Sequence, residues 1–354
     1  MNIGDLLKYT IQKNASDLHL SVGYPPIVRI DGLLEDVNKY VIDEQSMKTL
    51  IDPVMSDSQR EFLEVNKEID FSYEYPETKD RFRINVFHEK GKLAAAFRLI
   101  PQKIRTFEEL YLPDVMHKFT SLPQGLVLIT GPTGHGKSTT LAGMLEEINE
   151  KYPKHIITVE DPIEYVYPKG KCLIDQREIG LDTHSWDIAL RSVLREDPDV
   201  VLIGEMRDYE TISAAITIAE TGHLVFATLH TNSAAQTIDR IIDVFPDSQQ
   251  AQVRSQLADI IEGIIAQRLV PTIGGGRRAV LEVLMATPAV RNIVREGKTY
   301  QLDSIIQTSG DVGMISLERS LVSLVREGKI TIDDAKNYSS KPDEVLRLFR
   351  GRSE

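Results

Sequence analysis

The sequence is poor in cysteine and contains no long apolar run. Among its 354 residues there is one cysteine, Cys172, so neither an internal disulfide nor a cysteine zinc cluster can form, which fits a reducing compartment. Apolar runs such as residues 200–203 are far shorter than the ~18 residues of a membrane span. Residues 1–13 lack the basic and apolar segments of a signal peptide. We therefore expect a soluble, cytoplasmic protein that does not insert into a membrane.

Positive charge is also in deficit. Lysine and arginine number 41 against 53 aspartates and glutamates, which gives a formal net charge of −12. A sequence-independent nucleic-acid binder needs a basic surface that releases counterions from phosphates, so we expect no nucleic-acid partner. With 42% hydrophobic and 27% charged residues and no low-complexity tract, the composition is globular, and the length suggests two domains.

Residues 1–100 have the pattern of a mixed α/β domain. Apolar residues at a spacing of four predict a short helix that ends near Asn14. Apolar and polar residues then alternate over residues 18–22, as in a half-buried strand. Asp31-Gly32 after the next apolar run indicates a hairpin turn.

A second hairpin joins residues 81–88 to residues 93–100. If the turn is centred between positions 90 and 91, opposed residue numbers sum to 181, and one face of the pair is wholly apolar. The same register sets Arg83 directly opposite Arg98. Like charges opposed across strands are unfavourable by a few tenths to about 1 kcal/mol, so we expect an anion near the two arginines.

The pattern changes after residues 101–114, a segment with two prolines and poor periodicity that we interpret as a linker. Over residues 115–354, short apolar runs alternate with helical patterns, which is typical of parallel strands buried on both faces and predicts an α/β fold. The runs are residues 127–130, 156–159, 200–203 and 224–228. Three glycines at 274–276 indicate a hairpin tip, and residues 287–354 are predicted to be helical.

One segment matches the phosphate-binding P-loop pattern, directly after an apolar run and directly before a helical stripe. Its residues are Gly131, Pro132, Thr133, Gly134, His135, Gly136, Lys137 and Ser138. The glycines let backbone N–H groups turn toward phosphate oxygens, the lysine neutralises the outer phosphates, and the serine hydroxyl can bind magnesium. The motif predicts a site for ATP and Mg²⁺.

Acidic residues follow two other predicted strands. Glu160, Asp161 and Glu164 come after the second run, and Gly204-Glu205 come after the third, where a general P-loop enzyme has aspartate at 204. The carboxyl ends of parallel strands border the crevice in which α/β proteins bind ligands. A glutamate there can orient the attacking water, and Glu205 can hold a magnesium-bound water. A solvated acidic loop remains the alternative.

His230 lies just beyond the fourth apolar run. We consider a contact with the γ-phosphate or with a neighbouring chain, and a purely structural role is the alternative.

Four motifs in this order resemble the secretion ATPase superfamily, and Gly204-Glu205 is that family's own form. They are GPTGHGKST (131–139), ITVEDPIE (157–164), LIGEMRD (202–208) and TGHLVFATLHTNSA (221–234). Residues 15–20 resemble the family's small leading domain. The length and residues 289–296 are similar to type IV pilus retraction ATPases, whose signature usually has isoleucine, leucine and isoleucine at 290, 293 and 294.

The resemblance implies a PAS-like domain over residues 1–100 and a RecA-like ATPase domain over residues 115–354, assembled as a homohexamer. It implies ATP hydrolysis that drives pilus retraction at the inner face of the cytoplasmic membrane. The implied partners are an inner-membrane pilus platform protein and a paralogous retraction ATPase.

The resemblance also assigns roles to individual residues. Lys137, Ser138 and Thr139 would hold phosphates and magnesium, Glu164 would be the catalytic base, and Glu205 would be a metal-side acid, with Glu160 and Asp161 as further metal-side candidates. Arg83 and Arg98 would act in trans as arginine fingers, and His230 would join them at the catalytic centre. His135 departs from the family, which usually has serine there; we expect nucleotide binding to survive, with altered release or pH response.

Three other functions stay open. Assembly and type II secretion ATPases usually carry an additional N-terminal domain and a four-cysteine metal loop, which one cysteine cannot form. A hexameric nucleic-acid translocase is disfavoured by the net charge. A weakly hydrolysing accessory paralogue is disfavoured by the presence of Lys137, Glu164 and Glu205.

Overall fold

The computed structural model describes residues 2–30, 32–100 and 103–351. The chain forms two compact units, and each has its own hydrophobic core. The first unit is Met1–Lys103 with Pro162–Val166, and the second is Ile104–Asp161 with Tyr167–Glu354.

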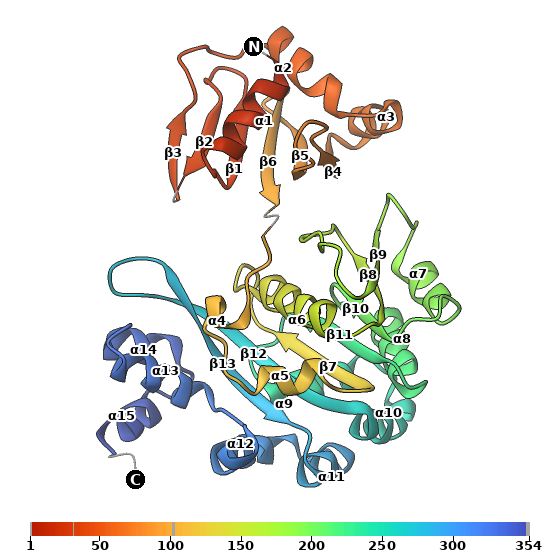
Figure 1. Cartoon of the computed structure of the whole chain (residues 1–354), viewed down its shortest axis with the longest axis vertical. Helices are drawn as coiled ribbons and strands as arrows, with labels where there is room; N and C mark the ends of the chain where they lie inside the picture. The colour runs from red at the N-terminus through yellow and green to blue at the C-terminus, as the bar shows by residue number, and fades with distance from the viewer. Residues whose placement is uncertain (1, 31, 101–102, 352–354) are drawn as a thin grey trace. The chain divides into compact units, whose positions relative to one another are not determined.

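The first unit is an antiparallel sheet of strand order β3-β2-β1-β6-β5-β4 (Figure 1). Its strands are β1 (Asp17–Ser21), β2 (Ile27–Ile30), β3 (Leu33–Asp36), β4 (Glu68–Glu74), β5 (Arg81–Glu89) and β6 (Lys92–Ile100). Its helices are α1 (Ile3–Gln12), α2 (Glu44–Ile51) and α3 (Asp57–Asn66). The predicted first helix and the strand after it are confirmed. So is the β2–β3 hairpin, although Asp31 of its turn lies outside the described residues.

The register predicted for the second hairpin is confirmed. Arg81 pairs with Ile100, Arg83 with Arg98 and Glu89 with Lys92, each pair summing to 181. The apolar residues of β5 and β6 point into the core of the unit, where Phe82, Ile84 and Phe97 are among the fully buried side chains.

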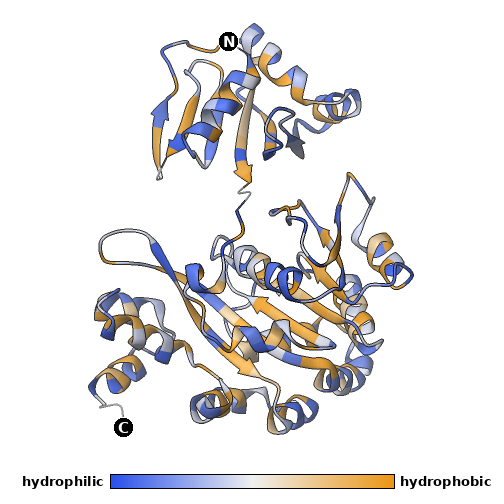
Figure 2. Cartoon of the chain, viewed as in Figure 1, coloured by the Kyte–Doolittle hydropathy of each residue, from blue (hydrophilic) through white to orange (hydrophobic). Residues whose placement is uncertain are grey.

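The second unit contains a seven-stranded sheet of order β13-β12-β7-β11-β10-β8-β9, in which only β13 runs antiparallel. The strands are β7 (Gly125–Thr130), β8 (His155–Glu160), β9 (Leu173–Glu178), β10 (Val200–Ile203), β11 (Leu224–Leu229), β12 (Ile261–Pro271) and β13 (Arg277–Met285). The four predicted strands correspond to β7, β8, β10 and β11, so the α/β prediction is confirmed. Figure 2 shows these central strands as a hydrophobic band.

The central strands are buried on both faces because their alternate side chains enter two different cores. Leu126 and Leu128 of β7 pack in the cluster that includes α8, α9 and α10, whereas Val127 and Ile129 pack in the cluster that includes α6. Fully burying each such side chain contributes about 1.5–3 kcal/mol. The helices are α5 (Met116–Thr120), α6 (Lys137–Lys151), α7 (Trp186–Val193), α8 (Tyr209–Glu220), α9 (Ala234–Asp243) and α10 (Asp247–Ile260).

Residues 104–114, within the predicted linker, belong to the second unit and contain the short helix α4 (Phe107–Leu110). Phe107 is buried in the cluster that includes α6. Residues 101–102 lie outside the described residues.

The last part of the chain is helical, as predicted, after the β12–β13 hairpin turns at Gly274–Gly276, all with positive φ. The helices are α11 (Pro288–Glu296), α12 (Leu302–Thr308), α13 (Leu317–Arg326), α14 (Ile332–Tyr338) and α15 (Pro342–Arg350). The string VREGK occurs at residues 294–298 and 325–329, and it predicts a shared helix stop because its glycine can adopt positive φ. Gly297 and Gly328 follow α11 and α13 with φ of 69° and 68°, which confirms this prediction. No helix in the described part of the chain has the length and hydropathy of a membrane span.

A carboxylate on β13 caps the helix that follows β11. The Oε1 atom of Glu282 accepts a hydrogen bond from the Ala234 N–H at the start of α9, at 2.7 Å. Burial, followed by the negative charges of Asp303 and Glu318, raises the pKa of Glu282 to about 7, against an ordinary value of 4.5. The hydrogen bond from the Ala234 N–H and, to a smaller extent, the Lys341 ammonium lower the pKa of Glu282.

This raised pKa predicts a pH-dependent stability. The stabilisation from the protonated carboxyl is fully present below pH 4.5 and is lost as the pH rises through about 7. The free energy of unfolding should therefore fall by roughly 3 kcal/mol between these limits. Glu282→Gln should remove most of that fall, because the amide oxygen still accepts from Ala234 and carries no charge. Urea unfolding at pH 5 and pH 8 measures it. Glu150→Gln, at an exposed position on α6, is the control; an equal change in both variants would contradict this account.

Candidate functional site

Strand register places three residues side by side at the carboxyl edge of the sheet. Thr130 at the end of β7 pairs with Leu229 of β11 on one side and with Ala266 of β12 on the other. The next residues along these strands are Gly131, His230 and Gln267. The phosphate loop therefore begins between a histidine and a glutamine.

The loop turns sharply through its glycines. Gly131, Gly134 and Gly136 have φ of 140°, 77° and 81°, values that side chains disfavour. A Cβ atom on Gly131 would lie 2.2 Å from the backbone oxygen of Gln267, so only glycine fits there. Gly136 is the N-cap of α6, and the loop therefore leads directly into the positive end of a helix.

Lys137 is the first residue of α6 and is buried. Its ammonium group donates to the backbone oxygens of Gly131 at 2.8 Å and Pro132 at 3.1 Å, across the mouth of the loop. Ser138 and Thr139 follow in the first turn and are partly exposed. A cation, helix N–H groups and two hydroxyls thus converge where an anion binds well.

His135, the departure from the usual serine, is turned toward β12. Its Nδ1 atom accepts a hydrogen bond from the Leu269 N–H at 3.0 Å, and its backbone oxygen accepts from Gln267 Nε2 at 2.8 Å. Burial and the charges of Arg277, Lys137 and Arg268 lower the pKa of the imidazole. The ring is therefore neutral at pH 7, with the proton on Nε2.

On the other side of the loop, His230 lies between the loop and an acid. Its Nδ1 atom is 3.4 Å from Thr133 Oγ1, and its Nε2 atom is 3.7 Å from Glu205 Oε2. The same carboxylate oxygen is 2.8 Å from Nε of Arg207. Burial and the Lys137 charge lower the pKa of His230, so a neutral ring connects the loop to Glu205.

The glycine before Glu205 has a packing reason. A Cβ atom at Gly204 would lie 3.2 Å from the Val159 oxygen and 3.3 Å from Cα of Glu160, on the neighbouring strand. The Gly204 oxygen also accepts from Thr228 Oγ1 at 2.6 Å. A side chain at position 204 would press on β8. The acidic residue of this strand is instead Glu205, the next residue along the chain.

The three acids after β8 lie in different surroundings. Glu160 is buried, and its Oε1 atom accepts from Thr158 Oγ1 at 2.6 Å and Gln176 Nε2 at 3.2 Å. Asp161 and Glu164 are exposed. Glu164 lies in Pro162–Val166, which groups with the first unit.

The donor set fits magnesium as P-loop proteins hold it. Within the described residues, no three His, Cys, Asp or Glu side chains form a metal-binding group. Mg²⁺ usually takes one or two carboxylates together with substrate phosphates and water, so it needs no such group. Ser138 and Glu205 suit that mode, whereas the hydrogen bonds on Glu160 hold it between β8 and β9.

The two predicted arginine fingers each have a carboxylate inside their own sheet. Arg83 is 3.2 Å from Asp70 on β4, and Arg98 is 3.0 Å from Asp17 on β1. The anion that the opposed arginines required is therefore supplied by the neighbouring strands. The finger role stays a prediction, without the support of the like-charge argument.

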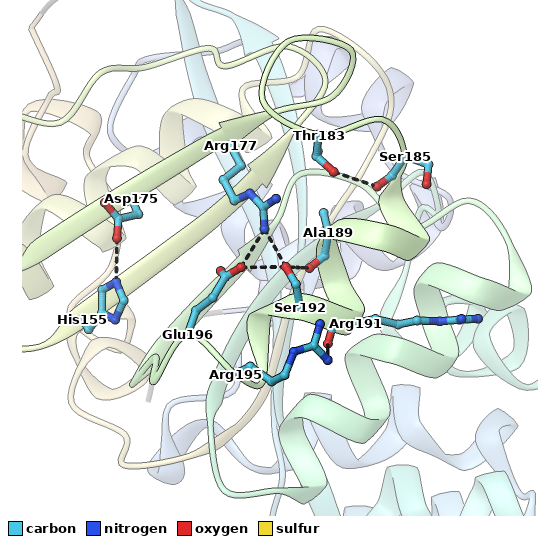
Figure 3. A network of polar contacts seen from close by, with 10 residues as sticks. All are labelled: His155, Asp175, Arg177, Thr183, Ser185, Ala189, Arg191, Ser192, Arg195 and Glu196. Atoms are coloured by element: carbon cyan, nitrogen blue, oxygen red, sulfur yellow. Dashed lines mark hydrogen bonds and ion pairs between the residues drawn. The ribbon is translucent and has the colours of Figure 1, made fainter.

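A separate polar network fixes α7 to β9. Arg177 donates to Ser192 Oγ at 2.7 Å and to Glu196 at 2.8 Å, and Figure 3 shows its guanidinium directed at both. His155 and Asp175 form another contact in the same view at 3.0 Å. These pairs join secondary-structure elements and are explained by structure alone, as is half-buried Cys172, whose thiol donates to the Tyr152 oxygen.

Sequence reasoning missed Gln267, Thr133's contact with His230, and Arg207. Gln267 directly follows the apolar run 263–266 and is followed by Arg268, so nothing in the sequence distinguishes it from an ordinary polar strand end. The other two contacts depend on loop conformation and had no sequence signal either.

Comparisons with known proteins agree on one family. The family profile described as type II/IV secretion system protein matches residues 3–275. The type IV pilus retraction ATPase PilT of Pseudomonas aeruginosa is 49% identical over 97% of this chain and 99% of its own length. A twitching motility protein of Neisseria gonorrhoeae is 47% identical over 90% of this chain and 86% of its own. A crystal structure of the pilus retraction motor PilT with bound ADP superposes with a TM-score of 0.91, at 47% identity, covering 98% and 99% of the two chains.

The contrast between two loop glycines gives a test of the site. Gly131→Ala should abolish nucleotide binding, because the new Cβ would meet the Gln267 backbone and force the loop away. Gly134→Ala meets nothing within 4 Å and costs only the strain of positive φ, about 1–2 kcal/mol. Titration with a fluorescent ADP analogue measures both. Equal affinities for the two variants would show that the loop does not bind nucleotide in this conformation.

Proposed function

The chain belongs to the type II/IV secretion system protein family, and we propose that it is an ATP-hydrolysing motor of type IV pilus retraction that works as a homohexamer. The observation that supports this best is the complete phosphate loop, with Lys137 at its mouth and His230 and Glu205 beside it. The match to a retraction ATPase extends over nearly the whole chain, so the activity is proposed for the chain as it stands.

The domain division follows from the same assignment. Residues 1–100 form a PAS-like domain, residues 101–114 a linker, and residues 115–354 a RecA-like ATPase domain with C-terminal helices over residues 287–354. The parallel order of β7, β11, β10 and β8 supports the RecA-like assignment of the second unit.

In the proposed reaction, water attacks the γ-phosphorus of ATP, and the bond to the bridging oxygen breaks, releasing ADP and phosphate. The Glu164 carboxylate orients the water and accepts its proton. Lys137 and the N–H groups at the start of α6 bind the phosphate oxygens and stabilise the negative charge that develops on them in the transition state. Ser138 and Glu205 would hold magnesium together with the nucleotide, where the ion would supply further positive charge, and Asp161 is a candidate for its outer ligands.

His230 reports the state of the loop to the acid. Its two ring nitrogens face Thr133 and Glu205, and the ring is held neutral, so one nitrogen donates and the other accepts. The Glu205 carboxylate can only accept, so Nε2 carries the proton and Nδ1 accepts from Thr133. A change at the loop that moves the ring therefore weakens or releases the contact with Glu205. This geometry supports a sensor of the outer phosphate over a purely structural histidine.

The motor acts at the cytoplasmic face of the inner membrane against the pilus platform protein, and a paralogous retraction ATPase is a further partner.

A deletion strain tests the direction of the motor. Excess surface pili without twitching support retraction, whereas loss of pili would identify an assembly ATPase. Purified protein should hydrolyse ATP without stimulation by single-stranded DNA. Undetectable hydrolysis would favour an accessory paralogue.

The two glutamates should respond differently to substitution. Glu164→Gln should abolish hydrolysis and retain nucleotide, because the amide keeps its shape but accepts no proton. Glu205→Gln should weaken the use of magnesium, and raising the magnesium concentration should partly restore its turnover. Steady-state ATPase assays over a magnesium series measure this. Rescue of Glu164→Gln in place of Glu205→Gln would exchange the two roles.

The in-trans role of Arg83 and Arg98 predicts complementation between inactive subunits. Arg83→Ala subunits mixed with Glu164→Gln subunits should recover activity, because some interfaces then pair an intact arginine with an intact glutamate. A stabilising arginine finger is worth roughly 10³–10⁵ in rate, so the recovery should be easy to detect. Arg29→Ala is the control: it removes an arginine of the same sheet that lies near Asp17, as Arg98 does, and it should remain active alone. Mixed rings that form but stay inactive would refute the assignment.

A further inference from the structure

We propose that Gln267 is a positioning residue of the phosphate loop. Together with His135 it ties the loop to β12 through hydrogen bonds, and we call this pair of residues the strap. The proposal rests on the ATPase function above and deepens it, by assigning the strand that holds the loop in its binding conformation.

Both ends of the Gln267 amide are engaged by the loop and its helix. The Oε1 atom accepts from Thr140 Oγ1 at 2.7 Å, and the Nε2 atom donates to the His135 backbone oxygen at 2.8 Å. Gln267 and Thr140 are each 2% exposed. A buried polar group that loses its hydrogen-bond partner destabilises the folded state, whereas a paired one fixes the conformation around it. The two hydrogen bonds of Gln267 therefore strongly restrict the conformation of the loop.

The backbone of Gln267 sets the other end of the loop. Its carbonyl oxygen lies so close to Gly131 that a Cβ atom there would be at 2.2 Å, and its Nε2 atom would lie 3.0 Å from a Cβ atom on Gly136. One residue of β12 therefore touches the first and the last glycine of the loop.

The bond to His135 also orients an N–H group. In a trans peptide the carbonyl and the following N–H point in opposite directions. Because the His135 carbonyl is fixed toward Gln267, the Gly136 N–H points away from β12. The Gly136 N–H is therefore not directed at the strand and is available to a phosphate oxygen, and the bond from Gln267 sets this orientation without nucleotide.

His135 adds a second tie to the same strand. β12 last pairs with β7 at Ala266, and beyond this point the Leu269 N–H donates to His135 Nδ1 at 3.0 Å. A serine hydroxyl lies one bond closer to the backbone, so the imidazole reaches a donor that serine does not. The histidine thus lengthens the attachment of the loop to β12.

A preorganised loop lowers the cost of binding nucleotide in both the ground state and the transition state. Removing the strap should therefore raise KM and leave kcat nearly unchanged, which is the mark of lost uniform binding. Gln267→Ala should raise KM for ATP and Kd for ADP roughly tenfold, because two buried hydrogen bonds are lost. His135→Ser should have a smaller effect in the same direction.

The matched control is Asn149→Ala. Asn149 is a fully buried amide at the far end of the same helix. Its side chain makes three hydrogen bonds: it donates to the Pro168 oxygen at 2.9 Å and to Glu146 Oε2 at 3.2 Å, and it accepts from the Cys172 N–H at 3.2 Å. The two variants should lose similar thermal stability. Only Gln267→Ala should weaken nucleotide binding.

Thr140 provides a second route to the same question. Thr140→Val keeps the shape of the side chain but cannot anchor Gln267, whereas Thr140→Ser restores the hydroxyl and should restore KM. The double variant Thr140→Val with Gln267→Ala should be no weaker than Gln267→Ala alone, because both act on one bridge.

The outcomes separate the strap from the proposed function. If the native protein hydrolyses ATP and Gln267→Ala keeps native KM while losing stability as Asn149→Ala does, Gln267 is structural and the inference is wrong. Should Gln267→Ala not fold, unchanged KM in Thr140→Val overturns the inference in the same way. A native protein without ATPase activity overturns the proposed function instead, while ADP titration still tests the strap.

Discussion

The register of the parallel strands is the constraint on which the candidate site depends. Thr130 aligns with Leu229 and Ala266, so His230 and Gln267 must flank the first residue of the phosphate loop. The same alignment, through Ile203 and Ala227, brings Glu205 to the edge beside β11. Side chains alternate along a strand, so a slip of one residue would turn each of these groups to the opposite face. Burial of both faces in two apolar cores makes such a slip prohibitively costly, and the chemistry is therefore held in place by packing.

Close packing at this edge also decides which residues can carry charge. Gly131 lies where a Cβ atom would overlap the backbone of a neighbouring strand, so it accepts no side chain, and a Cβ atom at Gly204 would be tight enough to require a small shift of β8. The acid that a general P-loop protein places at 204 appears at Glu205, where Arg207 and His230 surround it. In the first unit, the opposed arginines are balanced by Asp70 on β4 and Asp17 on β1, the strands that flank the β5–β6 hairpin. Charge is thus matched locally, and charge alone does not reveal which groups meet substrate.

Sequence patterns predicted the elements whose information is local. Apolar runs identified four of the central strands, a register sum of 181 identified every pair of the β5–β6 hairpin, and the repeated VREGK identified two helix ends. The phosphate loop was equally clear, because its glycines serve backbone geometry. What sequence did not predict depends on contacts between distant segments. Asp70 lies 13 residues from Arg83, and Gln267 lies 132 residues from His135, and no periodicity links either pair. Such contacts arise from strand order, which the order of motifs along the chain does not determine.

Helix α11, which carries the residues similar to the retraction signature, is joined to strand β12. The positions at which this chain differs from the retraction signature, Val290, Ile293 and Val294, are all buried, so a partner cannot contact them directly. Its exposed residues, among them Asn292, Arg295 and Glu296, match the signature. Arg291 of this helix binds Glu262 near the start of β12 at 2.6 Å, and Gln267, five residues further along that strand, holds the phosphate loop. A partner that binds the exposed face of α11 would therefore act on a helix anchored to the strand that contacts the phosphate loop. The connection between α11 and the phosphate loop therefore consists of one ion pair, the segment of β12 from Glu262 to Gln267, and one hydrogen bond.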